Sequence, residues 1–470
     1  MNVNRRGFLR RSIASALGGV GVYSALGNLQ LVAAASRLSK GIPTDYRALV
    51  CVFLFGGNDS FNTLVPYSAP HYGVYNASRP ALAIAQSAAA NLSLTALPAQ
   101  PGLPGGLASD GASYGLHPAM PDLRALFNNQ RAAVIGNVGT LMGPITQAEY
   151  QAGTRPTPPQ LFSHDDQANL WQTSRPDDVN ADGWGGRIAD LLYNDNPNQQ
   201  LPMTVSIAGQ NLFQRGSVID QYVMSPAGAP PIDYLRIYQN ELGVDAFNAL
   251  MASGTQAHMF ERAYASATRR SISSYQMINS ALDGVTQPLT TVFPNSTLGQ
   301  QMRMVARLIQ VREALGMRRQ VFYVGLGGFD THNDQIATHG TILGDLSQSL
   351  SAFYSATQEL SLADKVTAFT ASDFGRTIST NSDGTDHGWG GHHFVVGGAV
   401  RGGRFFGQMN SLAQLNNPND AGYGQVIPTT SVDQYAATLA AWFGVDNSGL
   451  ADIFPRLYQY ATPNLGFMQA

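Results

Sequence analysis

The sequence feature that most constrains the fold of this chain is a set of short stretches of consecutive apolar residues. The first run extends from Ala48 to Phe55, which is too short for most helices, and Gly56-Gly57 ends it. Runs of this kind are typical of strands buried on both faces, and such strands occur in parallel sheets. We predict further strands of the same type at residues 132–136, 203–207, 320–325, 366–371 and 394–400.

Helical patterns lie between these runs, at residues 120–127, 167–172, 187–193, 261–282, 298–315, 342–360 and 432–443. Strands that alternate with helices predict an α/β fold, here a three-layer sandwich with a mostly parallel central sheet. With 44% hydrophobic and 13% charged residues, the chain has ample material for a core. We predict one domain over residues 37–470, with long loop insertions rich in Gly, Pro and Ala near 87–115, 144–159 and 224–231.

Residues 1–36 are predicted to be an export signal rather than part of the fold. The start Arg5-Arg6-Gly7-Phe8-Leu9 resembles the twin-arginine signal, and an uncharged stretch from Ser12 to Ser36 follows it. That stretch is long enough for a membrane anchor, but its four glycines, Asn28 and Gln30 favour a cleaved signal. We therefore expect the twin-arginine export machinery as a partner and a periplasmic or secreted protein, with no stable membrane span after cleavage.

Charge and cysteine content exclude a nucleic-acid partner and an internal disulfide. The 28 Lys and Arg residues face 31 Asp and Glu residues, and no dense basic run occurs beyond residue 11. A nucleic-acid partner would require a basic surface. Cys51 is the single cysteine, so it has no partner for a disulfide within the chain.

Acidic and histidine side chains gather next to the predicted strands, at the sheet edge where open α/β folds bind ligands. After the strands come Asp59, then Asp330, His332 and Asp334, and then Asp373 with Arg376; His387, His392 and His393 precede the last strand. Mixtures of Asp and His recruit divalent metals such as Zn²⁺ or Mn²⁺. Two such ions can clamp both oxygens of a displacement at phosphorus or sulfur. The sequence therefore predicts a site for one or two divalent metals, zinc or manganese.

Several of these residues also have an ordinary structural interpretation. Asp59 after Gly-Gly-Asn can close an Asx turn, and Asp334 can cap the helix that follows it. Asp373 can form an ion pair with Arg376. What favours a site is that three separate strand ends carry Asp or His.

Two serines are candidate nucleophiles. Ser163 precedes a helical pattern, and the amides and dipole at a helix start favour a developing anion. Ser163 also fits a capping box with Asp166, and the two interpretations are compatible. Ser60, directly beside Asp59, is the alternative nucleophile.

Five motifs in order, together with the twin-arginine start, resemble one exported bacterial family, called domain of unknown function 1501. The motifs are Phe55-Gly56-Gly57-Asn58-Asp59, Leu161-Phe162-Ser163-His164-Asp165-Asp166-Gln167, Gly328-Phe329-Asp330-Thr331-His332, Ser372-Asp373-Phe374-Gly375-Arg376-Thr377 and Gly384-Thr385-Asp386-His387-Gly388-Trp389-Gly390-Gly391-His392-His393. The resemblance covers essentially the whole mature chain. This family is related to the alkaline phosphatase and sulfatase-like superfamily, so the resemblance implies that fold.

The resemblance also implies site roles, because superfamily enzymes hold two metals between strand-end Asp and His residues. It implies Asp59 as the first-strand ligand, Ser163 as the nucleophile and Arg376 as a fork for an anionic substrate group. Asp330 with His332 or Asp334 would hold one metal and Asp373 the other, with a late histidine chosen from His387, His392 and His393.

Three departures from the superfamily pattern affect these assignments. Asp373-Phe374 stands where Asp-His is expected, and Asp330-x-His332-x-Asp334 replaces Asp-x-x-x-His. The absence of a Cys-x-Pro-x-Arg signature excludes a formylglycine sulfatase. We expect an exported, metal-dependent hydrolase that acts on a small anionic ester or an envelope-derived substrate, an ester of phosphate or sulfate. The alternative is a non-catalytic periplasmic binding protein that retains the fold.

Overall fold

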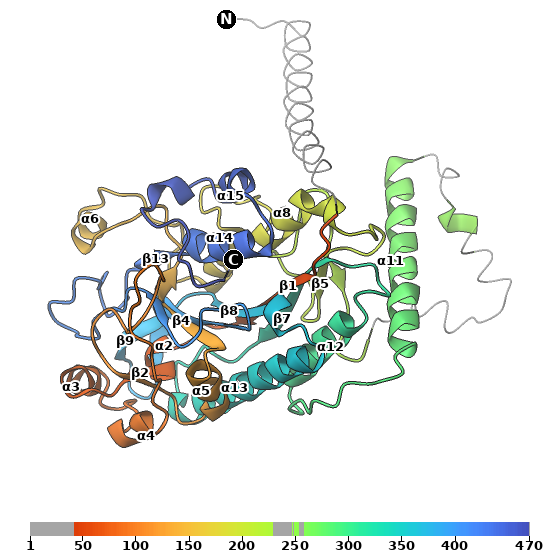
Figure 1. Cartoon of the computed structure of the whole chain (residues 1–470). Coiled ribbons are helices and arrows are strands. Elements are labelled where there is room, and N and C mark those ends of the chain that lie inside the picture. The colour runs from red at the N-terminus through yellow and green to blue at the C-terminus, as the bar shows by residue number, and fades with distance from the viewer. Residues whose placement is uncertain (1–41, 229–246, 248, 253–257, 470) are drawn as a thin grey trace, which may run out of the picture.

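A mixed sheet lies between two layers of helices in the computed structural model, which describes residues 42–228, 247, 249–252 and 258–469 (Figure 1). The strand order is β12–β4–β11–β8–β1–β7–β5–β6, with β13 paired to β4. β11 is antiparallel to β4 and β8, and the other pairs of this sheet are parallel. The strands are β1 (Arg47–Leu54), β4 (Ala132–Gly139), β5 (Thr204–Ser206), β6 (Tyr222–Val223), β7 (Arg319–Leu326), β8 (Val366–Ser372), β11 (Gly391–Gly397), β12 (Phe405–Gly407) and β13 (Thr430–Ser431).

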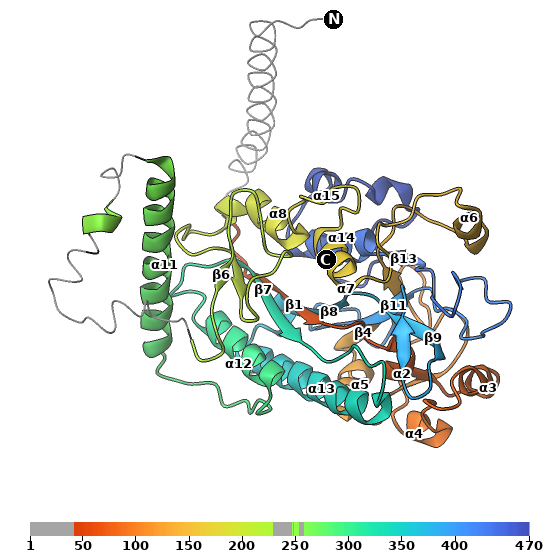
Figure 2. The ribbon, with the colours of Figure 1, turned by 180° about the vertical axis from the view of Figure 1, so that it is seen from behind.

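The side chains of β1 alternate between two cores, one on each face of the sheet. Ala48, Val50, Val52 and Leu54 belong to the first core, with α5 (Pro121–Asn128), α12 (Thr297–Gln310) and α13 (Gln335–Glu359). Leu49, Cys51 and Phe53 belong to the second core, with α7 (His164–Thr173), α8 (Trp184–Leu191), α14 (Val432–Phe443) and α15 (Asn447–Ile453). Figure 2 shows these two helical layers on opposite sides of the sheet. The predicted three-layer α/β sandwich is confirmed.

Every strand and helix that the sequence predicts is present, but some ends differ. α13 begins at Gln335, seven residues before the predicted start of that helix at 342, because its first two turns carry mixed polar residues. α12 ends at Gln310 rather than 315, and a series of turns continues from there to Gly316. α11 (Met259–Asp283) follows the predicted pattern and lies beside α12.

Two of the predicted insertions contain short elements of their own. α4 (Gln86–Asn91) and β3 (Tyr114–Leu116) border the first, and α6 (Gln147–Ala152) lies in the second. The third runs past residue 228 into a segment outside the described residues.

The predicted export signal at residues 1–36 also lies outside the described residues. Within the described ranges, no helix combines the length and the apolar character needed to cross a bilayer.

A buried ion pair fixes the chain just after β1. Asp59 caps α2 (Ser60–Thr63), where its Oδ1 accepts hydrogen bonds from the backbone N–H groups of Phe61 and Asn62, at 3.1 and 3.3 Å. Arg79 donates to both carboxylate oxygens, at 3.0 and 2.7 Å, and neither side chain is exposed. Although burial raises the pKa of Asp59, the charge and hydrogen bonds of Arg79 lower it below its usual value.

We expect Arg79→Met to destabilise the fold by roughly 3–5 kcal/mol, because the substitution leaves the Asp59 carboxylate buried without its cation. The matched control is Arg155→Met, which removes an exposed pair with Glu149 and should leave the unfolding midpoint close to that of the unchanged protein. Urea denaturation of both variants measures the difference. Equal midpoints would show that the Asp59–Arg79 pair does not hold this part of the fold.

Candidate functional site

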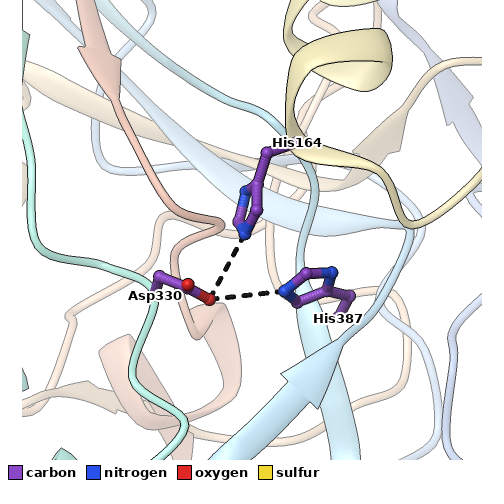
Figure 3. Close-up of side chains that lie close together, drawn as sticks. All are labelled: His164, Asp330 and His387. Carbon is purple, nitrogen blue, oxygen red and sulfur yellow. Dashed lines mark ion pairs between the residues drawn. The ribbon is translucent and has the colours of Figure 1, made fainter.

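Three side chains from distant parts of the chain meet at the edge of the sheet (Figure 3). His164 is the first residue of α7, Asp330 follows β7, and His387 ends β10 (Thr385–His387). One nitrogen or oxygen atom from each lies within 4.8 Å of the others. The structure therefore brings together a cluster of two imidazoles and one carboxylate.

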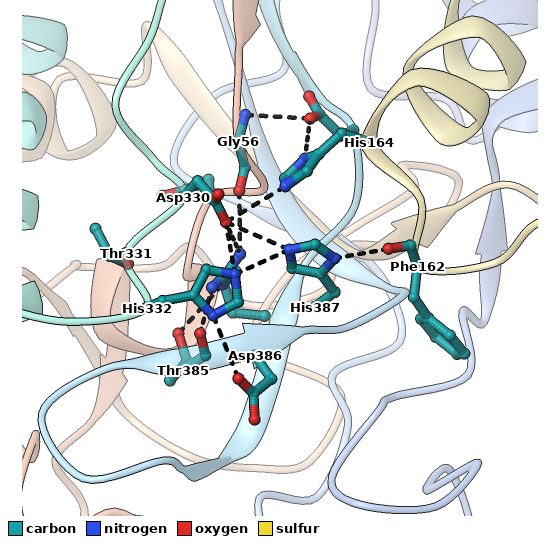
Figure 4. A network of polar contacts seen from close by, with 12 residues as sticks. Gly56, Phe162, His164, Asp330, Thr331, His332, Thr385, Asp386 and His387 are labelled. Carbon is teal, nitrogen blue, oxygen red and sulfur yellow. Dashed lines mark hydrogen bonds and ion pairs between the residues drawn. The ribbon is translucent and has the colours of Figure 1, made fainter.

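The carboxylate oxygen Asp330 Oδ1 is the centre of this cluster. It lies 3.3 Å from His164 Nε2, 3.4 Å from His387 Nε2 and 3.0 Å from His332 Nε2 (Figure 4). Partial burial raises the pKa of Asp330, but the hydrogen bond and charge of Arg376, with smaller contributions from His332 and His164, lower it below its usual value. Asp330 is therefore a carboxylate at neutral pH.

The outer nitrogens of two imidazoles are held by acceptors. His164 Nδ1 donates to Asp373 Oδ2 at 2.7 Å, and His387 Nδ1 donates to the Phe162 carbonyl at 2.6 Å. Because both acceptors lack hydrogens, the Nδ1 atoms carry the protons and the Nε2 lone pairs of the neutral rings face Asp330. Metal-binding histidines are oriented in this way. The residues present therefore fit a divalent metal such as zinc.

Gly56 lets the end of β1 approach the cluster closely. Its φ of 111° is a left-handed conformation that favours glycine, and a Cβ atom there would collide with the backbone nitrogen of Asp330. The Gly56 N–H donates to Asp373 Oδ2 at 3.1 Å, and its carbonyl accepts from Arg376 at 3.2 Å. Gly56 thus links the partner of His164 to the partner of Asp330.

Arg376, predicted to bind a substrate anion, instead has its guanidinium fully occupied within the protein. The residue begins β9 (Arg376–Thr380), and its side chain has no exposed surface. Its Nη1 donates to Asp330 Oδ1 at 2.8 Å, and the other nitrogens donate to Thr385. Arg376 therefore orients Asp330 and does not face the solvent.

The structure does not bring Asp59, Ser60 or Asp334 into the cluster. Asp59 pairs with Arg79 and accepts a further hydrogen bond from Gln335, and Ser60 is buried against Gly391. Asp334 is exposed at the start of α13, where it forms no side-chain cap.

Of the three late histidines, His387 is the one in the cluster. His392 and His393 are buried within β11. His392 Nδ1 accepts from the backbone N–H of Asn137 at 3.0 Å, and His393 Nδ1 lies 3.1 Å from Thr370 Oγ1. Burial lowers the pKa of His392 to about 4 and that of His393 to about 3, so both are neutral core residues.

Ser163 immediately precedes His164, as the N-cap residue of α7. Its hydroxyl donates to Asp166 Oδ2 at 2.7 Å and makes no hydrogen bond to the helix backbone. The predicted capping box is therefore replaced by a pair of side chains. In the sequence, Ser163 lies between Phe162, whose carbonyl accepts from His387, and His164 of the cluster.

Sequence reasoning missed three contributions to this site. His164 lies in the same motif as Ser163, and a histidine at a helix start next to a candidate nucleophile was the available signal. Asp386 also had a signal, since it directly precedes His387, and its Oδ1 lies 3.3 Å from His332 Nδ1. The Phe162 carbonyl had none, because a backbone acceptor cannot be read from residue types.

Comparison with known proteins identifies a family. The model of the family described as "Protein of unknown function (DUF1501)" matches residues 46–451. No curated protein matches the chain.

Among solved structures, the chain is similar to proteins at 8 to 11% identity. The lipoteichoic acid synthase LtaP from Listeria monocytogenes has 8% identity and a TM-score of 0.33, over 87% of this chain and 78% of that one. The C-terminal periplasmic domain of EcEptC from Escherichia coli has 11% identity and a TM-score of 0.33, over 91% and 89%. The PsFucS1 sulfatase from Pseudoalteromonas sp. has 9% identity and a TM-score of 0.32, over 89% and 72%.

We expect the affinity for Zn²⁺ to fall as the pH falls, and to begin falling above the ordinary histidine pKa of 6.5. The hydrogen bond and charge of Asp373, and to a smaller extent Asp330, raise the pKa of His164 although burial opposes them. A proton on His164 must leave before Nε2 binds a metal, so protons compete with zinc at a higher pH than usual. Competition with a chelating dye at a series of pH values measures this. Equal affinities at neutral and mildly acidic pH would contradict it.

Proposed function

The chain belongs to the family described as "Protein of unknown function (DUF1501)". From the geometry of its site, we propose that it is a metal-dependent hydrolase of phosphate or sulfate esters. One observation carries the proposal. The Nε2 atoms of His164 and His387 converge on Asp330 Oδ1, while Asp373 and the Phe162 carbonyl hold their outer nitrogens. Imidazoles whose outer nitrogens are held by hydrogen bonds in this way are typical of metal centres.

His164, Asp330 and His387 would hold the ion. Zinc or manganese would supply positive charge that stabilises the negative charge developing on the ester oxygens. Asp373 and Phe162 keep the two imidazoles in the binding orientation. Arg376 keeps Asp330 ionised and in place.

Ser163 is the proposed nucleophile. Its oxygen would form a bond to the phosphorus or sulfur of the ester as the bond to the alcohol oxygen breaks and the alcohol leaves. Water would then attack the same phosphorus or sulfur, which releases phosphate or sulfate and restores the serine hydroxyl. Asp166, which already accepts the hydroxyl hydrogen at 2.7 Å, would receive the proton. The backbone amides at the start of α7 would favour the anion that develops there.

Export is part of the same proposal and is supported by the twin-arginine pattern of residues 1–36. Substrates would then be small anionic esters or esters derived from the cell envelope, and the protein would act in the periplasm or outside the cell.

A second candidate function is a non-catalytic binding protein. Two observations favour it. Phe374 stands where a histidine ligand is expected, and its ring packs 4.8 Å from the rings of both His164 and His387. In addition, the guanidinium of Arg376 is paired with Asp330 within the protein, so the side chain that was predicted to bind the substrate anion does not face a substrate.

We expect Ser163→Ala to lower the hydrolysis of aryl phosphates or aryl sulfates by roughly a thousandfold or more, because it removes the attacking oxygen. The matched control is Ser296→Ala, which removes the N-cap serine of α12 and should leave turnover unchanged. Both assays use the zinc-loaded full chain, and melting temperatures show whether each variant is folded.

Two outcomes would contradict this assignment. Loss of turnover in Ser60→Ala but not in Ser163→Ala would transfer the nucleophile to Ser60. A zinc-loaded protein that hydrolyses neither ester would favour the binding protein.

A further inference from the structure

We infer that a pocket beside β12 and β13, at the outer edge of the central sheet, binds an uncharged, hydroxyl-rich ligand, namely a neutral segment of a glycan. The pocket has a volume of about 480 Å³, which is within the usual range for pockets that hold small ligands. This inference goes beyond the proposed function, because it requires neither a metal nor turnover.

The pocket opens at the same edge of the sheet as the metal cluster but is separate from it. β12 is parallel to β4, and β4 runs in the same direction as β7 because β11, between β4 and β8, is antiparallel to both. The end of β12 at Gly407 therefore lies on the same edge as Asp330 after β7. Five strand spacings of about 4.8 Å place β12 roughly 24 Å from β7. None of the three cluster residues lines the pocket.

One wall of the pocket is the first insertion predicted from the sequence, which folds back onto β12. Gly106 and Phe405 exchange two backbone hydrogen bonds, at 2.8 and 3.1 Å. The buried guanidinium of Arg404 donates to the carbonyls of Pro98 and Gly105, at 3.3 and 3.2 Å. These contacts hold the insertion in place, so the pocket is formed before a ligand binds.

The wall of the pocket carries no charged side chain. The described residues that line it include no Asp, Glu, Lys, Arg or His. A phosphate or carboxylate group would find no cation there, and an ammonium group would find no carboxylate, so a charged ligand would lose hydration without gaining a partner. The ligand that fits is therefore neutral.

The polar groups of the wall match a ligand that both donates and accepts hydrogen bonds. The Thr430 hydroxyl donates to the Gly136 carbonyl at 2.9 Å, and the Thr429 hydroxyl donates to the Gln408 carbonyl at 3.3 Å. Because a hydroxyl has one hydrogen, both oxygens present only lone pairs to the pocket. The side chains of Gln408 and Thr462 are exposed and can donate as well as accept. Hydroxyl groups on a ligand satisfy all of these groups.

Apolar surface lies beside these polar groups. Leu107 is 61% exposed, Ala99 is exposed and Leu465 is half-exposed, and all three line the pocket. A sugar ring carries hydroxyls at its rim and C–H groups on its faces. It therefore complements both parts of the wall.

An extended peptide does not fit, because little of the edge of β12 is free. A peptide that extends a sheet pairs its backbone with an exposed edge strand. β12 has three residues, and Gly106 occupies the outward backbone groups of Phe405. Since backbone groups alternate in direction along a strand, Gly407 is the other residue of β12 whose N–H faces outward. The edge thus offers one donor for a ligand hydroxyl rather than a ladder for a peptide.

The experiment titrates the full chain with three neutral trisaccharides, maltotriose, cellotriose and chitotriose, in a calorimeter. We expect at least one of them to bind with a Kd of about 1 mM or below. The anionic trigalacturonate should bind more weakly than that sugar, because the wall has no cation.

Two variants test whether the sugar binds in this pocket. Ala99→Trp, which fills part of the pocket, should abolish binding, and Thr429→Val, which removes one acceptor, should weaken it about fivefold or more. The matched control is Ala152→Trp at an exposed position of α6, which should leave binding unchanged. Melting temperatures show whether each variant is folded, and Thr429→Val decides if Ala99→Trp does not fold.

Several results would overturn the inference. These are no binding of any neutral trisaccharide, tighter binding of trigalacturonate, or unchanged binding in the folded pocket variants. An uncharged peptide that binds where the sugars do not, and that Ala99→Trp blocks, would also overturn it.

The binding measurements are independent of the proposed function. Trisaccharide binding that persists in Ser163→Ala, in a protein that hydrolyses no ester, would uphold the inference and contradict the hydrolase. Ester hydrolysis without trisaccharide binding would do the reverse.

Discussion

At the site, the Arg376 guanidinium is not exposed to water and forms hydrogen bonds with three separate chain segments. Arg376 donates to the Gly56 carbonyl after β1, to Asp330 after β7 and to Thr385 on β10. Because a buried cation without partners is costly, these contacts fix the position of Asp330. Asp330 Oδ1 is in turn the atom that three imidazoles approach, so the geometry of the cluster depends on this one buried charge.

The fold was predictable where burial leaves a simple pattern. β1 carries apolar residues on both faces because two helical layers cover it, and its residues from Ala48 to Leu54 form one continuous apolar run. The start of α13 was not predictable, because residues 335–341 include Gln335 and His339, which are buried in polar contacts with Asp59 and Asn58 and do not continue an apolar stripe. Hydrophobic periodicity is a weak guide to where a helix begins when its first side chains make buried polar contacts.

The site was predictable only in part, for a similar reason. The rule that ligands bind at strand ends pointed to Asp330, His332, His387 and Asp373, which the structure brings together with His164. It also pointed to Asp59, but the partner Arg79 reaches that carboxylate only through the fold. His392 and His393 lie one or two residues inside β11, where a strand end becomes sheet interior. A sequence shows which residues are near a strand end but not which way each side chain turns.

The donors of the cluster come from His164, Asp330 and His387, so more than 200 residues separate the first from the last. Contacts between such distant segments require loop closure and form late in folding. The cluster therefore cannot assemble until β7 has joined the central sheet and both the start of α7 and the separate β9–β10 hairpin have packed at its edge. An ion bound there would act as a cross-link between the early and the late parts of the chain, and it would enter only a molecule that had already folded.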